Sequence, residues 1–155
     1  MLKKYMPFIL SIAIALGVGG LSAYLTKESM SIYSAINRPP LSPPSWIFPI
    51  VWSVLFVLMG ISAALVWKSN GGTLDTALLF YAAQLVVNFC WTLIFFNFRA
   101  YFAAFIWLLL LLVLILITII MFYRKNKAAG WLLFPYFVWV CFAGYLNFSI
   151  WILNK

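Results

Sequence analysis

Residues 38–67 read RPPLSPPSWIFPIVWSVLFVLMGISAALVW, a proline-rich segment that passes directly into an apolar run with tryptophan at both ends. The run from Trp46 to Trp67 carries no charged side chain. As a helix it is long enough to cross the roughly 30 Å hydrocarbon core of a bilayer. The four prolines before it remove backbone donors and prevent a continuous helix. This stretch therefore predicts a transmembrane helix that follows a stiff loop.

The rest of the chain repeats this apolar pattern. Of its 155 residues, 67% are hydrophobic and 8% are charged, whereas about a quarter of the residues of a soluble domain are charged. Aromatic residues mark the ends of the apolar runs, as at membrane interfaces. We expect an all-α membrane protein with one domain over 1–155, a five-transmembrane-helix bundle with a proline-rich loop between helices 1 and 2. The expected helices cover roughly 5–25, 46–67, 74–96, 101–123 and 131–153.

Small residues recur every four positions in the first run, at Ala15, Gly19 and Ala23. Small side chains on one face allow another helix to approach closely inside a membrane. We therefore expect this face of the first helix to pack tightly within the bundle.

The net charge of +8 would suggest nucleic acid in a soluble protein, but here the basic residues lie near the ends of apolar runs. They are interpreted as topology anchors, with lipid and not nucleic acid as the partner. Basic residues accumulate on the cytoplasmic side, so the more basic side is expected to be cytoplasmic. That is the N-terminal side, with Lys3, Lys4, Lys68, Arg124, Lys125 and Lys127, against Lys27, Arg38, Arg99 and Lys155 on the other.

Ionisable side chains are nearly absent from the apolar runs. The only acids are Glu28 and Asp75, at or outside the ends of the runs, and the chain has no histidine. Proton relays and ion pathways use ionisable groups at membrane depth, and zinc sites use histidine or carboxylate ligands. The sequence thus disfavours pumping by such groups and a metal site. We expect no required cofactor, although cysteine, methionine or tyrosine remain conceivable iron ligands.

Three predicted helices combine aromatic rings, small residues and amides on one face. One reading is that the amides only join helices and the rings only fill the bundle. Because 20% of the chain is aromatic, the combination also suits a flat apolar ligand with polar edges. The three faces consist of Trp52, Phe56, Met59 or Gly60, and Ala63; Gln84, Asn88, Trp91 and Phe95; and Tyr136, Trp139, Ala143 and Asn147.

Three stretches carry a resemblance to a known family. Residues 38–67, quoted above, resemble the second-helix signature of the TspO/translocator-protein family, formerly called peripheral-type benzodiazepine receptors (TspO/MBR). Residues 84–96, QLVVNFCWTLIFF, and 132–154, LLFPYFVWVCFAGYLNFSIWILN, resemble its third and fifth helices. The resemblance implies a bacterial member in the cytoplasmic membrane. It also implies a compact bundle, often a homodimer, whose ligand cavity opens toward the proline-rich loop.

The resemblance further implies an integral membrane receptor or translocator. Members bind porphyrins such as protoporphyrin IX and haem, and drug-like isoquinoline carboxamides and benzodiazepines, so porphyrin would be a ligand or substrate. The chain lacks a basic residue soon after Tyr145, which argues against a sterol ligand. Trp107 stands where animal members carry an acid, which implies fewer polar contacts in the cavity. By resemblance, the cavity residues are Tyr33, Pro43, Ile47, Trp52, Phe56, Asn88, Trp91, Trp139, Ala143, Leu146 and Asn147.

Two alternative functions remain at this point. One is enzymatic: the resemblance implies light- and oxygen-dependent degradation of bound protoporphyrin IX, with Trp52 and Trp139 as the catalytic residues. The other is a structural membrane partner whose cavity is incidental. The same rings would serve stacking or photochemistry, so their presence in the sequence does not separate binding from catalysis.

Overall fold

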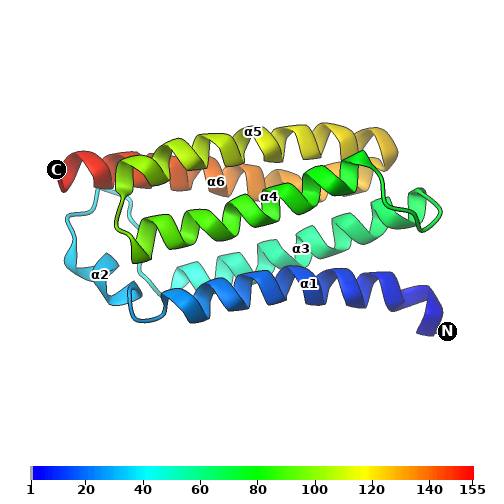
Figure 1. Ribbon diagram of the computed structural model, residues 1–155, viewed down its shortest axis with the longest axis horizontal. Coiled ribbons are helices and arrows are strands. Elements are labelled where there is room, and N and C mark those ends of the chain that lie inside the picture. The colour runs from blue at the N-terminus through cyan, green and yellow to red at the C-terminus, as the bar shows by residue number, and fades with distance from the viewer. Residues whose placement is uncertain (1) are drawn as a thin grey trace.

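The computed structural model describes residues 2–155 and is built from five long helices that run along one axis (Figure 1). Five helical segments are long and apolar enough to span a membrane, and η1 continues α4 to complete the third of them. The expected fold class is therefore confirmed. The elements are α1 (Leu2–Thr26), α2 (Met30–Ala35), α3 (Ile47–Ser69), α4 (Thr76–Thr92), η1 (Leu93–Asn97), α5 (Tyr101–Lys125) and α6 (Lys127–Leu153).

The helices form a closed ring around the core. In that ring α1 packs along α3, α3 along α6, α6 along α5 and α5 along α4, while α1 and α4 meet only lightly. The small-residue face of α1 lies toward the bundle: Ala15 is fully buried and Gly19 faces Phe56. Ala23, the third small residue of this face, is exposed, so the expected tight packing holds around Ala15 and Gly19 but not at Ala23. The seam between α1 and α4 is the weakest in the ring.

The turn between α5 and α6 is shorter than expected. The predicted connection over 124–130 is wrong, because Asn126 alone separates the two helices. Its side chain accepts a hydrogen bond from the Ala129 N–H at 3.1 Å, which caps α6. A Cβ atom on Gly130 would lie 2.6 Å from Cβ of Tyr123, so the tight reversal needs glycine there. Capping thus starts α6 four residues before the predicted position.

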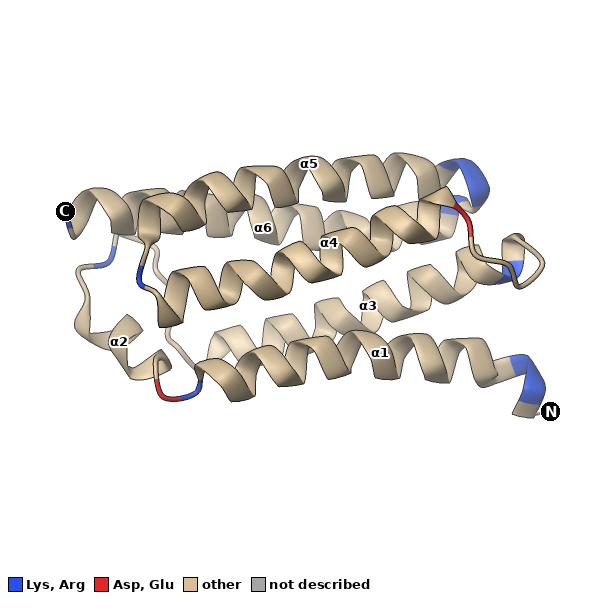
Figure 2. Ribbon diagram, in the orientation of Figure 1, with Lys and Arg blue, Asp and Glu red and all other residues tan. Residues whose placement is uncertain are grey.

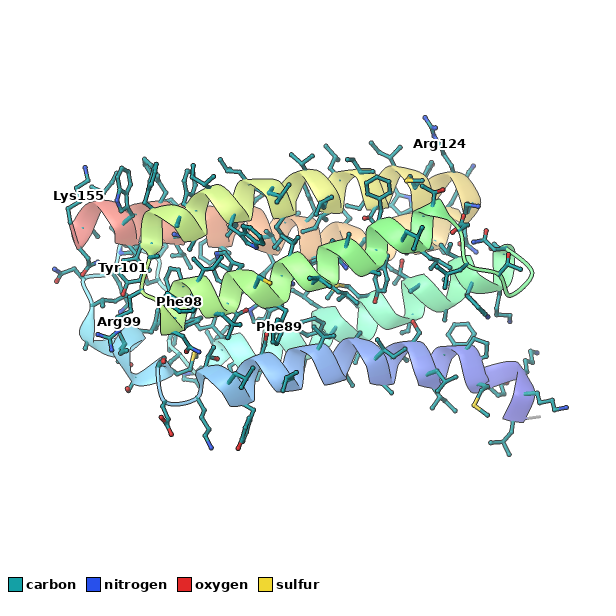
Figure 3. All side chains as sticks on the ribbon, in the orientation of Figure 1. Phe89, Phe98, Arg99, Tyr101, Arg124 and Lys155 are labelled. Carbon is teal, nitrogen blue, oxygen red and sulfur yellow. The ribbon has the colours of Figure 1, made fainter. Side chains whose placement is uncertain are left out.

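Charged residues lie only at the two ends of the bundle within residues 2–155 (Figure 2). The end that carries the N-terminus holds six basic residues and Asp75, and the opposite end holds four basic residues and Glu28. In Figure 3, Arg124 marks the first end, and Arg99 and Lys155 mark the second. The membrane-crossing part of the bundle is free of formal charge, as the sequence predicts.

Asp75 joins two helices at the N-terminal end. Its carboxylate caps α4 by accepting the Leu78 N–H at 3.1 Å, and it pairs with Lys125 at the end of α5. Partial burial acts to raise the pKa of Asp75, but the hydrogen bonds from Lys125 and Leu78 and the positive charge of Lys125 outweigh it. The pKa therefore lies below its ordinary value. The carboxyl stays ionised and holds α4 against α5.

The loop between α1 and α3 contains the short helix α2, followed by an irregular segment over 36–46. Leu41 in this segment has φ of 68°, a left-handed conformation that side chains with a Cβ rarely adopt. The Ser42 hydroxyl holds the turn by donating to the Pro39 carbonyl at 2.7 Å. The proline-rich segment is thus a defined turn, in agreement with the predicted stiff loop.

Hydrogen bonds fasten this loop to the far end of the chain. Asn37 donates its backbone N–H to Oδ1 of Asn154 at 3.1 Å, and Asn154 Nδ2 donates to the Asn37 carbonyl at 2.8 Å. We call this pair the Asn37–Asn154 clasp. The Tyr145 hydroxyl of α6 adds a hydrogen bond to the Pro40 carbonyl at 3.0 Å. The loop is therefore anchored to α6.

Candidate functional site

A cavity lies beside α2, between α1, α3, α4, η1 and α6, with a volume of about 140 Å³. Its wall combines aromatic rings with small side chains and a few polar groups. The small residues come mainly from α1, which leaves room in front of the rings of α3 and α6. The lining residues are Gly19, Ser22, Ala23, Thr26, Met30, Phe48, Pro49, Trp52, Phe56, Asn88, Trp91, Thr92, Phe96, Trp139 and Ala143.

Two tryptophans in the wall are held by other rings. Trp52 packs against Phe56 with a centroid distance of 5.6 Å and against Tyr136 at 6.2 Å. Trp139 packs edge-on against Phe48 at 6.0 Å. Such aromatic pairs add about 0.5–1.5 kcal/mol each beyond area burial. Both indoles are therefore held in place at the cavity wall.

The indole N–H of Trp139 is the unpaired donor of this wall. It is buried and has no hydrogen-bond acceptor among residues 2–155. A buried donor without a partner costs about 1–3 kcal/mol. A ligand that places an acceptor beside Trp139 would remove this cost.

A buried polar network lies behind the rings. Tyr136 donates its hydroxyl to Oε1 of Gln84 at 2.7 Å and accepts from Nδ2 of Asn88 at 2.8 Å. This bond orients Asn88, whose side chain also lines the cavity. Gln84 and Asn88 therefore join α4 to α6 through Tyr136, and the side chain of Asn88 also lines the cavity.

Trp91 is positioned in a similar way. Its Nε1–H donates to Oδ1 of Asn147 at 3.0 Å, and Nδ2 of Asn147 donates to the Tyr101 carbonyl at 2.7 Å. This chain of hydrogen bonds connects α4 with α6 and α5. It holds the Trp91 ring in the wall. Both ends of the Asn147 amide form hydrogen bonds with other residues of the protein.

The structure brings six of the eleven predicted ligand residues into the cavity wall: Trp52, Phe56, Asn88, Trp91, Trp139 and Ala143. The other five lie outside the wall. Tyr33 is buried, bonds the Pro43 carbonyl at 3.3 Å and packs on Phe48. Ile47 is half-buried at the start of α3, and Leu146 and Asn147 are buried in α6. Of these five, Tyr33 and Asn147 support residues that line the cavity.

Sequence reasoning missed the contribution of α1 and η1. Gly19 and Ala23 were visible as a small-residue face, but they were assigned to helix packing and not to a cavity. Phe96 belongs to the π-helical turn η1, a geometry that is frequent at functional sites and has no simple sequence signal. Among residues 2–155 no group of three His, Cys, Asp or Glu side chains could hold a metal ion.

The sequence of this chain is similar to those of known proteins. Residues 10–152 match the profile of the TspO/MBR family. The chain belongs to the TspO/MBR family. It is 36% identical to the tryptophan-rich protein TspO of Chlorobaculum tepidum, over 98% of each chain. It is also 38% identical to protein CrtK of Rhodobacter capsulatus, over 79% of this chain and 78% of the relative. With the human translocator protein it shares 33% identity over 94% of this chain and 87% of the relative.

The polar network of this TspO/MBR chain can be tested by replacing Tyr136 with phenylalanine. The change leaves the Asn88 and Gln84 amides without their shared partner, at a cost of about 1–3 kcal/mol. We expect the melting temperature in detergent to fall by roughly 5 °C. Tyr5→Phe is the control, because Tyr5 is exposed near the N-terminus. Equal melting temperatures for the two variants would show that the network adds no stability.

Proposed function

We propose that this protein is a receptor- or translocator-type membrane protein that binds flat, largely apolar molecules with polar edges in the cavity beside α2. Porphyrins, such as protoporphyrin IX and haem, are the proposed natural class. Isoquinoline carboxamides and benzodiazepines are proposed as synthetic ligands. The observation that carries the proposal is the unpaired indole N–H of Trp139 in a wall rich in aromatic rings.

The chemistry of the wall supports this choice of ligand. Flat rings stack favourably on indole and phenyl groups, and a membrane-embedded wall without charge favours an apolar body. The Trp139 N–H supplies a hydrogen bond for an acceptor at the edge of the ligand. The porphyrin and drug classes come by analogy from the resemblance to the family.

Binding of a whole porphyrin requires the cavity to widen. Its volume of about 140 Å³ is below the roughly 300–1,000 Å³ of typical ligand pockets. The seam that opens most easily is the one between α1 and α4, because these two helices meet only lightly, whereas α1 packs closely along α3. We propose that α1 and α2 move outward together on binding, while α3 and α6 keep Trp52 and Trp139 in place.

A second candidate function is light-dependent degradation of bound porphyrin. It is favoured by the presence of both Trp52 and Trp139 in one cavity wall. Indole is the most readily oxidised apolar side chain, so each ring is suited to donate an electron to an excited porphyrin beside it, with oxygen as the proposed co-reactant. Such chemistry would need no acid, base or metal.

The proposed setting is the cytoplasmic membrane of a bacterium, with the N-terminus on the cytoplasmic side and a homodimer as the assembly. Six basic residues at the end that carries the N-terminus support this orientation. The apolar outer face of α1 suits contact with either lipid or a second copy.

Titration with protoporphyrin IX followed by illumination tests both functions. We expect saturable quenching of tryptophan fluorescence and loss of the porphyrin absorption band in light. Trp52→Phe and Trp139→Phe keep an apolar ring, so binding should persist with up to about tenfold weaker affinity for Trp139→Phe, which loses the hydrogen bond. Degradation should slow in both variants. Trp131→Phe is the control, because Trp131 is exposed at the start of α6.

The outcomes separate the two candidate functions. Absence of saturable quenching in the wild-type protein contradicts both. Saturable binding together with an unchanged degradation rate in Trp52→Phe and Trp139→Phe rules out the tryptophan mechanism but leaves the receptor function.

A further inference from the structure

A second, larger cavity of about 600 Å³ lies at the N-terminal end of the bundle, in the wedge between α1, α3 and α4. It shares no lining residue with the first cavity. Its volume falls within the roughly 300–1,000 Å³ range of small-molecule sites. The wall is formed by Lys3, Met6, Pro7, Leu10, Ser11, Ile14, Ala63, Ala64, Trp67, Leu74, Leu78, Tyr81, Ala82 and Leu85.

The position of this wedge follows from the weak seam between α1 and α4. From Lys3 to Ile14 the wall extends about 16 Å along α1, from the charged end toward the middle of the bundle. Leu10 and Ile14 contribute to the wall and are also exposed at the outer surface. The cavity is therefore long and apolar, and it is bordered by side chains that contact the lipid phase.

Two polar groups distinguish this wall from an ordinary lipid-facing groove. Lys3 places an ammonium group at its outer end, at the more basic end of the molecule. Tyr81 is only 7% exposed, and its hydroxyl has no hydrogen-bond partner among residues 2–155. The acid described at this end, Asp75, is already paired with Lys125. Lys3 makes no ion pair among residues 2–155, and the Tyr81 hydroxyl is a buried donor without a partner behind the wall.

We propose that this cavity binds one anionic glycerophospholipid. Its phosphate lies at Lys3, an ester carbonyl accepts the Tyr81 hydroxyl after that side chain rotates toward the wedge, and an acyl chain runs along Leu10, Ile14 and Leu85. A phospholipid carries these three groups in this order from the membrane surface inward. For a flat porphyrin the wedge offers fewer stacking rings than the first cavity, since only Trp67 and Tyr81 are aromatic in its wall.

The proposal is tested by native mass spectrometry of the full chain. Before the measurement, the protein is exchanged into vesicles of phosphatidylcholine that contain about 10% phosphatidylglycerol. We expect one phosphatidylglycerol per chain to survive removal of the bulk lipid. Ala82→Trp fills the wedge from an exposed position in its wall and should reduce retention at least tenfold. Ala83→Trp is the matched control, because Ala83 is exposed on the same helix but does not line the cavity.

Two further variants identify the polar contacts. Lys3→Gln should remove most of the preference for phosphatidylglycerol over phosphatidylcholine, whereas Lys127→Gln at the same end should not. Tyr81→Phe should weaken retention of both lipids about fivefold, the loss of one hydrogen bond. Porphyrin titration of Ala82→Trp should match the wild type, so failure of either proposal leaves the other intact.

Several results would overturn the proposal. Equal retention by Ala82→Trp and Ala83→Trp would show that lipid binds elsewhere. Equal retention of the two lipids by the wild type would exclude recognition of an anionic head group. Displacement of phosphatidylglycerol by oleate at equal concentration would identify a free fatty acid as the occupant.

Discussion

Replacing Gly19 by leucine is expected to weaken protoporphyrin IX binding at least 100-fold, about 2.7 kcal/mol. Gly19 lines the first cavity, and a Cβ atom there would lie 2.5 Å from Cε2 of Phe56 and 2.6 Å from its Cδ2. The new side chain must push the Phe56 ring into the cavity or occupy the space itself. In a volume of about 140 Å³ either response removes the room for a ligand ring.

Gly20→Leu is the matched control for this prediction. Gly20 is the next residue of α1 and is exposed, and a Cβ atom there would meet no heavy atom within 4 Å. Both variants gain similar helix propensity, so the difference between their affinities for protoporphyrin IX reports the effect of filling the cavity. Fluorescence titration measures both affinities. Wild-type affinity in Gly19→Leu would place the ligand outside this cavity.

Replacing Gly60 by leucine is expected to separate α1 from α3. A Cβ atom on Gly60 would lie 2.5 Å from Cα and 2.8 Å from the backbone N of Ile12, so a helix backbone is the obstacle. Overpacking usually costs about 1–3 kcal/mol, and a backbone obstacle places the cost at the upper end. We expect the melting temperature in detergent to fall by about 10 °C or more, measured by thermal unfolding followed by size-exclusion chromatography.

The control for Gly60→Leu is Gly17→Leu, because Gly17 on α1 has open space around its Cβ position. Its melting temperature should equal or exceed that of the wild type, since leucine favours the helix. Similar melting temperatures for the two variants would show that α1 and α3 do not approach closely at Gly60.

The fold was predictable from the sequence because each helix must satisfy its backbone hydrogen bonds within the membrane. Apolar length alone therefore located the five spans. The start of α6 was predicted four residues too late, because the apolar pattern begins only at Trp131, whereas Asn126 caps the helix within the polar segment before it. The π-helical turn after Thr92 also escaped prediction, since apolar periodicity does not distinguish it from an α-helix.

The cavity was predictable only in part. Helical spacing correctly placed Gln84, Asn88, Trp91 and Phe95 on one buried face of the third span. Helical spacing did not reveal that the Asn147 amide would form its hydrogen bonds with Trp91 and the Tyr101 carbonyl. Hydrogen-bond partners on other helices decide which amide faces the cavity, and the pattern of one helix does not contain that information.

The second cavity had no signal in the sequence. Trp67 was interpreted as an interface residue and Ala63 as part of a ligand-facing stripe, yet both line the wedge at the N-terminal end. A wedge arises from the divergence of α1 and α4, a property of helix packing. Such a cavity becomes visible only when the relative positions of the helices are known.

The Asn37–Asn154 clasp has a consequence for biosynthesis. Its two residues are separated by 117 positions, and Asn154 follows the last transmembrane helix. Until α6 has been inserted, this loop lacks its hydrogen bonds to Asn154 and Tyr145 and is held at its start by the Ser29 hydroxyl, which donates to Asn97 at 2.9 Å. A nascent chain with only four helices in the membrane would also lack Trp139 and the Tyr145 bond to Pro40. The wall of the first cavity is therefore complete only once α6 has packed against α3.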